Sequence, residues 1–66
     1  MMFDLRQFTI DNLIKGYEEG SFTRAQVSIF SMNYMMKGII TQEDIVYINE
    51  QMDLIDEQVE DEEIVE

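Results

Sequence analysis

The feature that most constrains this chain is a helix-start signal that occurs twice, 18 residues apart. Residues 20–27 read Gly-Ser-Phe-Thr-Arg-Ala-Gln-Val, and residues 38–45 read Gly-Ile-Ile-Thr-Gln-Glu-Asp-Ile. The glycines, Gly20 and Gly38, suit the left-handed conformation that closes a helix. The threonines, Thr23 and Thr41, can cap the following helix through their hydroxyls. The repeat therefore predicts, at two places, the end of one helix, a short turn and the start of another.

A weaker signal of the same kind opens the chain, where Asp4 can act as a cap and Phe3 can pack against Phe8. Isoleucine and valine favour strands at 39–40 or 45–48, but the spacing of the apolar residues is helical. The spacing is clearest in the third segment, where apolar residues recur at steps of 3, 4, 3 and 4. We therefore predict an all-α fold with helices at about 5–18, 24–37 and 42–58, forming a helical hairpin or a small bundle.

The composition excludes most catalytic chemistry. The 66 residues include no His and no Cys, so the chain has no imidazole base, no thiolate nucleophile and no His/Cys metal site. Neighbouring carboxylates such as Glu18 and Glu19 point about 100° apart on a helix, so they do not form a facing acid–base pair. We expect a protein that is not an enzyme, with no catalytic residue, no cofactor, no metal and no small-molecule substrate.

The net charge of -11 is unevenly distributed. Residues 1–50 carry 7 acidic and 4 basic side chains, whereas residues 51–66 carry 8 acidic and none basic. This pattern predicts a helical domain over 1–59 and an acidic, disordered tail over 60–66, with the third helix fraying from about residue 59. The tail either keeps the protein in solution or competes for a basic groove on a partner.

The same charge pattern bears on partners and localisation. Four scattered cations do not form a phosphate-binding stripe, so direct binding of nucleic acid is not expected. No apolar run approaches the roughly 18 residues that a membrane helix needs, and the N-terminus lacks the pattern of a secretory signal. The expected location is the cytoplasm or a virion.

More apolar surface is present than three short helices can cover. The middle segment is apolar almost all round, and the third carries an apolar seam. The three methionines in the middle segment form either a small core or an exposed docking face. The predicted partner is a protein, either a second copy or a larger protein, and the predicted interaction residues are Phe30, Met32, Tyr34, Met35, Met36, Ile45, Ile48, Met52, Ile55 and Val59.

The stretch from Leu13 to Ile48 resembles the small XkdX-like proteins encoded in the tail regions of phages and defective prophages. The resemblance lies in Tyr17, Gly20, Phe22-Thr23, Val27 and the run from Lys37 to Asp44. It implies a virion or phage-morphogenesis setting and no known activity. The leading hypothesis is a non-enzymatic interaction or oligomerisation protein that docks through apolar helix faces. The alternative is an acidic inhibitor that mimics DNA and blocks a host nucleic-acid-binding protein.

Overall fold

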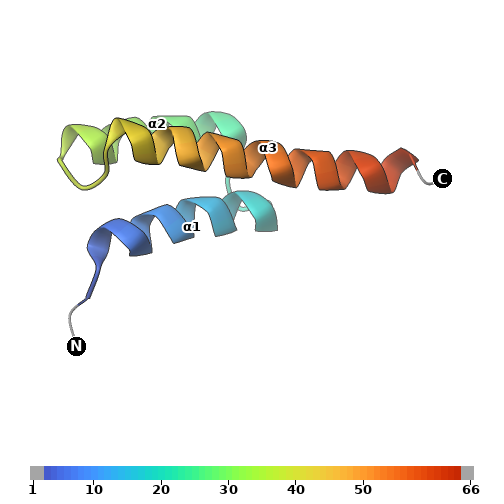
Figure 1. Ribbon diagram of the computed structural model, residues 1–66. Helices are drawn as coiled ribbons and strands as arrows, with labels where there is room; N and C mark the ends of the chain where they lie inside the picture. Colours follow the sequence, from blue (N-terminus) through green and yellow to red (C-terminus); the bar gives the residue numbers. More distant parts are fainter. Residues whose placement is uncertain (1–2, 65–66) are drawn as a thin grey trace.

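The computed structural model describes residues 3–64, with side chains described as far as Gln58. Helix α1 spans Leu5–Glu19, α2 spans Arg24–Met36 and α3 spans Gln42–Ile64. No strand occurs in residues 3–64, so the predicted all-α fold is confirmed. Helices α1 and α3 run in the same direction, and α2 runs antiparallel to both (Figure 1). Each helix packs against the other two, so the arrangement is a small bundle rather than an open hairpin.

The repeated start signals form reciprocal caps at α2 and α3. Thr23 Oγ1 accepts a hydrogen bond from the Gln26 N–H at 3.1 Å, and Gln26 Oε1 accepts one from the Thr23 N–H at 2.9 Å. At α3, Thr41 Oγ1 accepts from the Asp44 N–H at 3.2 Å, and Asp44 Oδ2 accepts from the Thr41 N–H at 2.9 Å. Both caps satisfy backbone donors that a helix start would otherwise leave unpaired, and both predictions are confirmed.

The start of α1 has the third predicted cap. Asp4 Oδ1 accepts a hydrogen bond from the Gln7 N–H at 3.1 Å. Phe3 precedes this cap and Phe8 follows it in the chain, and their rings pack against each other with centroids 5.2 Å apart. This contact is the hydrophobic staple expected from the spacing, and it fixes the direction in which the chain enters α1.

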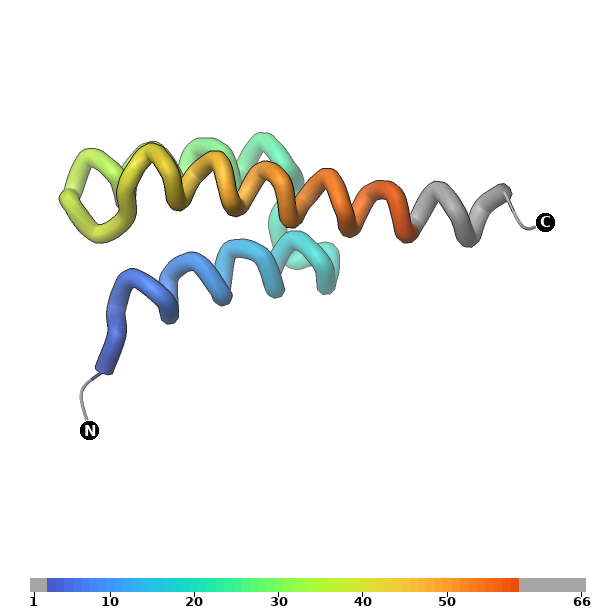
Figure 2. The backbone as a smooth tube through the Cα atoms, viewed as in Figure 1, coloured from blue at the N-terminus to red at the C-terminus, as the bar shows by residue number. Residues whose placement is uncertain are grey.

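The two predicted turn glycines adopt the left-handed conformation. Gly20 has a φ of 86° and Gly38 a φ of 80°. After Gly20 the chain folds back, and the Ser21 N–H donates to the Gly16 carbonyl at 2.8 Å. The two tight turns reverse the chain between consecutive helices, as the tube in Figure 2 shows. A residue with a Cβ is strained at such a φ, so glycine at these positions lets each helix end where it does.

The core lies where the three helices meet. Its buried members come from every helix and from the second turn: Ile10, Leu13, Val27, Ile40, Ile48 and Met52. Half-buried apolar side chains surround it: Ile14, Tyr17, Phe22, Phe30, Tyr34, Met35, Ile39 and Ile45. Most of the apolar seam predicted on the third helix is therefore used inside the molecule.

Helix α3 is longer than predicted. It ends at Ile64, beyond the end at 58 that the accumulating carboxylates led us to expect. Half of the residues from 59 to 64 are glutamates, which have a high intrinsic helix propensity, and this preference outweighs the unfavourable dipole interaction. The predicted acidic tail over 60–66 concerns side chains that lie outside the described residues, so it stays a prediction.

A close contact across the first turn explains a glycine that the sequence analysis did not single out. Gly16 is buried in the last part of α1, and the ring of Phe22 lies directly over it. The same ring packs edge-on against Phe30, with centroids 5.2 Å apart. Because Gly16 has no side chain, the turn can bring this aromatic pair against α1.

We predict that Gly16→Ala destabilises the fold, although alanine is the better helix former. The new methyl group would overlap the Phe22 ring, and overpacking of this kind costs about 1–3 kcal/mol. The gain in helix propensity offsets about 1 kcal/mol of that cost. Urea denaturation followed by circular dichroism should show a net loss of up to about 2 kcal/mol in the free energy of unfolding. Asn12→Ala, at an exposed position in α1, is the control and should not lower stability. A Gly16→Ala chain more stable than the wild type would contradict the contact.

Candidate functional site

The most conspicuous exposed feature is a row of apolar side chains along the outer face of α2. It consists of Ala25, Ile29, Met32 and Met36, and we call it the α2 outer stripe. Ile29 is 58% exposed, Met32 56% and Met36 79%, and Ala25 is exposed as well. The steps of 4, 3 and 4 residues place all four side chains on one side of a helix. Within the described residues, no part of the chain covers this row.

The opposite side of α2 faces the core. Val27 and Ser31 are buried there, and Phe30, Tyr34 and Met35 are half-buried against the core. The predicted interaction residues of the middle segment are thus divided between two faces. Phe30, Tyr34 and Met35 pack inside the molecule, whereas the other two predicted members are exposed: Met32 and Met36.

The predicted interaction residues of the third segment need a correction. Ile48 and Met52 are 1% and 0% exposed, so they cannot dock onto another protein while the chain is folded. Ile45 and Ile55 are half-buried, and the side chain of Val59 lies outside the described residues. The physical reason is that α1 and α2 both pack on this face of α3, so the seam is filled by the chain's own helices.

A polar contact ties the start of α1 to the start of α3. The Arg6 guanidinium donates to both oxygens of Asp44, from Nε at 2.8 Å and from Nη2 at 2.6 Å. The Asp44 carboxylate is almost fully buried. The hydrogen bond from Arg6, and then the one from the Thr41 N–H, lower the pKa of Asp44 from 3.8 to about 2. This carboxylate therefore has a structural role, and it also caps α3.

A second polar cluster joins all three helices at the other end of the bundle. The Tyr17 hydroxyl in α1 donates to Asp56 in α3. Arg24 in α2 donates to Asp56 Oδ2 at 2.9 Å and to Asp53 Oδ1 at 2.6 Å. The hydrogen bond to Asp56 also raises the pKa of Tyr17 above its ordinary value of 10.0. We call Tyr17, Arg24, Asp53 and Asp56 the three-helix cluster.

Sequence reasoning missed both polar contacts. It assigned no ion-pair partner to any carboxylate, whereas three of those in α3 bind arginine. The partners are between 29 and 39 residues apart in the chain, so no local spacing could identify them. The one available signal was the shortage of cations. With 4 basic and 15 acidic side chains, each basic side chain has many possible ion-pair partners.

Other large apolar side chains are exposed outside the α2 outer stripe. One group lies at the start of α1 and another is spread along α3: Phe3, Leu5 and Phe8, then Val46, Tyr47 and Leu54. The α3 group shares its side of the helix with Glu43 and Glu50, which are exposed. Carboxylates raise the cost of covering such a surface. The α2 outer stripe, whose four members are all apolar, is the stronger candidate for a contact surface.

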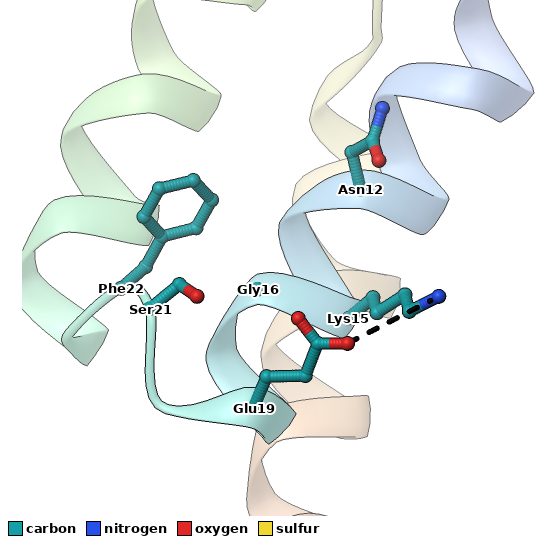
Figure 3. Close-up of a pocket in the computed structure, with 6 residues that line it drawn as sticks. All are labelled: Asn12, Lys15, Gly16, Glu19, Ser21 and Phe22. Carbon is teal, nitrogen blue, oxygen red and sulfur yellow. Dashed lines mark ion pairs between the residues drawn. The ribbon is translucent and has the colours of Figure 1, made fainter.

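Two shallow hollows lie on the described surface. The first, of about 530 Å³, lies between α1 and the turn that follows it (Figure 3). On its wall, Lys15 and Glu19 form an exposed ion pair at 4.0 Å, and the Phe22 ring lies on the other side of Gly16. The hydroxyl of Ser21 is exposed here, but in the described part of the chain it has no hydrogen bond to a base.

The second hollow, of about 360 Å³, surrounds the pair formed by Arg6 and Asp44. Arg6 and Asp44 are already engaged with each other, and the remaining charged group of its lining is the exposed Glu43. Among residues 3–58, no group of three acidic side chains is arranged to hold a metal ion. The helices of the described region are too short or too polar to cross a membrane.

No match to this chain was found. The comparison covered models of protein families, curated proteins and solved structures. What the chain can do must therefore be inferred from its own surface. The α2 outer stripe can form an apolar contact with another protein, and neither hollow brings together the groups that a reaction would need.

Proposed function

We propose that this chain is a non-enzymatic interaction protein, which docks through an apolar helix face onto itself or onto a larger protein. The observation that carries the proposal is the α2 outer stripe. Three large apolar side chains lie more than half exposed in one row, and such a row costs free energy in water until a partner covers it. The resemblance to XkdX-like proteins favours a phage or prophage setting, in the virion or during its assembly.

The chemistry of the stripe also suits adaptable docking. Two of its four members are methionines, whose flexible and polarisable side chains fit partners of different shape. The rest of the protein provides a stable support, because the capping box at Thr23, the two turns and the hydrogen bonds of Arg24 hold α2 against its neighbours. A rigid helix that presents an unpaired apolar face is a common form of protein recognition element.

The alternative function is that of an acidic inhibitor that mimics DNA and blocks a nucleic-acid-binding protein. The net charge of -11 favours it, as does a row of exposed glutamates on α3 at Glu43, Glu50 and Glu57. Residues seven apart on a helix are separated by about 10.5 Å, which is wider than the spacing of phosphates along one DNA strand. Asp44, Asp53 and Asp56 are held by arginines within the molecule. These features make mimicry the weaker explanation.

We expect a glutamate in the stripe to abolish docking without unfolding the chain. Met32→Glu introduces a charge into the centre of the contact surface, at an exposed position where the fold tolerates it. Leu54→Glu is the matched control, since Leu54 is also about half exposed but lies on α3. Sedimentation velocity and pull-down from phage-infected cells should both show binding by wild type and Leu54→Glu, and a loss with Met32→Glu.

Two outcomes decide between the functions. Docking through the stripe would be ruled out by two results together. The wild-type chain would sediment as a monomer at high micromolar concentration, and wild type and Met32→Glu would capture the same proteins. Binding that weakens steeply with salt and is indifferent to Met32→Glu would support the acidic inhibitor instead, because charge contacts are screened by salt and apolar contacts are not.

A further inference from the structure

The charges of this protein single out α2 as the helix that another copy could approach. The chain has a net charge of -11, yet no acidic residue occurs from Gly20 to Gln42. That stretch contains all of α2 and both of its flanking turns. The described parts of α1 and α3 each carry several carboxylates. Two such chains repel each other over most of their surfaces, and the α2 outer stripe is where that repulsion is weakest.

The spacing of the stripe is the same in both directions. Read forwards or backwards, its four members follow steps of 4, 3 and 4 residues. If a second copy of α2 lies antiparallel on the first, Ile29 of each copy faces Met32 of the other. In the same register, Ala25 faces Met36. The small side chain of Ala25 thus leaves space that the long, most exposed side chain of Met36 can fill. Such pairing of small and large side chains is typical of well-packed helix contacts.

The ends of α2 favour the antiparallel register over the parallel one. In the antiparallel register, Lys37 of one copy lies at the same end of the pair as the three-helix cluster of the other, where one arginine is shared by two carboxylates. Lys37 is exposed, and within residues 3–58 it makes no ion pair. A parallel register would instead bring the two clusters together, each with a net charge of -1, and the two lysines together. Charge complementarity therefore selects one orientation.

The flanks of the stripe are polar and uncharged, as suits the rim of a protein interface. Ser28 and Asn33 lie on either side of the stripe, and both are exposed. In the antiparallel register, the two copies of Ser28 line one edge of the contact and the two copies of Asn33 line the other edge. Both edges are polar and uncharged, so no charge is buried at the rim.

We propose that two copies of this chain pair through α2, antiparallel about a two-fold axis that passes between Ile29 and Met32. The proposal rests on the proposed function, since it names the partner that covers the same stripe. The contact is isologous, because the same patch on each copy meets itself, and such contacts close as dimers without forming filaments. The carboxylates of α1 and α3 then lie on the outside of the dimer.

Sedimentation equilibrium of the full chain tests the pairing. Wild-type protein should form dimers in a concentration-dependent manner, and added salt should strengthen the association because it screens the repulsion between two acidic chains. Met32→Glu should weaken it at least about tenfold, and Leu54→Glu should leave it unchanged. Circular dichroism checks that both variants stay helical. A strictly monomeric wild type, an association weakened by salt, or equal effects of the two variants would each overturn the proposal.

Disulfide cross-linking tests the orientation, and it can use single cysteines because the natural chain has none. An Ala25→Cys chain mixed with a Met36→Cys chain should form the mixed disulfide in preference to either symmetric one. Preferential formation of the two symmetric disulfides would indicate a parallel pair and would refute the register.

The failure of self-pairing is distinguishable from the failure of docking in general. A monomeric wild type that still captures a larger protein, and loses it on Met32→Glu, would refute the dimer and leave the proposed function in place. A monomeric wild type that captures nothing through the stripe would refute both.

Discussion

Replacing Met52 by alanine is expected to unfold a large fraction of the molecules. Met52 is completely buried between the three helices, and removing a buried methionine side chain costs about 2–5 kcal/mol in lost contacts and cavity formation. A core of this size supplies about 3–5 kcal/mol of net stability. The chain has no disulfide that could compensate. Urea denaturation followed by circular dichroism should show a midpoint close to zero denaturant.

The matched control is the same substitution at an exposed methionine. Met36→Ala removes the same atoms from the outer face of α2, and at low protein concentration it should change the free energy of unfolding by no more than about 0.5 kcal/mol. If Met52→Ala were as mild as Met36→Ala, the seam of α3 would not be the core of the molecule.

The second large effect is expected at Asp44, and it should depend on pH. Replacing Asp44 by asparagine leaves Arg6 without its carboxylate partner and weakens the cap on α3. The loss of buried hydrogen bonds to a charged group is expected to cost about 1–3 kcal/mol at neutral pH. The measurement is the difference in unfolding free energy between wild type and Asp44→Asn across a pH series.

The sign of the pH dependence follows from the direction of the shift. The pKa of Asp44 is lowered to about 2 in the folded chain, from 3.8, so its stabilising effect is fully present above about pH 4. It is lost as the pH falls from there through about 2. The other carboxylates are the same in both chains, so their contributions to the unfolding free energy largely cancel in the difference. Asp53→Asn, at an exposed ion pair, should cost about 1 kcal/mol or less. If the difference in unfolding free energy between wild type and Asp44→Asn persisted undiminished at pH 2, it would not come from the ionised Asp44 carboxylate.

The local features of this fold were predictable because each depends on a few neighbouring residues. A cap joins a side chain to a backbone group three residues away, so Asp4, Thr23 and Thr41 could be identified from spacing alone. The two turn glycines follow from the same reasoning, since a helix that ends needs a residue free to adopt a positive φ. The end of α3 was misjudged because helix propensity and the helix dipole act in opposite directions there.

The division of apolar residues between core and surface was not predictable in the same way. The sequence shows that α2 is apolar on nearly all sides, but which side faces inward depends on how α1 and α3 pack on it. Ile29 was therefore overlooked as a surface residue, and Ile48 and Met52 were wrongly placed in an interface. The role of Gly16 depends on the path of the first turn, which brings Phe22 over it. These errors share one cause. The spacing of apolar residues shows that a helix has an apolar face, but it does not show whether the chain's own helices, a partner or solvent covers that face.

The two short turns have a consequence for how quickly the chain acquires its structure. Because each turn joins helices that pack directly on each other, the search for native contacts is short, and small helical bundles with local contacts typically fold in microseconds to milliseconds. A ribosome adds only about 5–20 residues per second. A newly synthesised chain should therefore settle into its bundle almost as soon as its last helix emerges, with little time for misfolding or for chaperones to act.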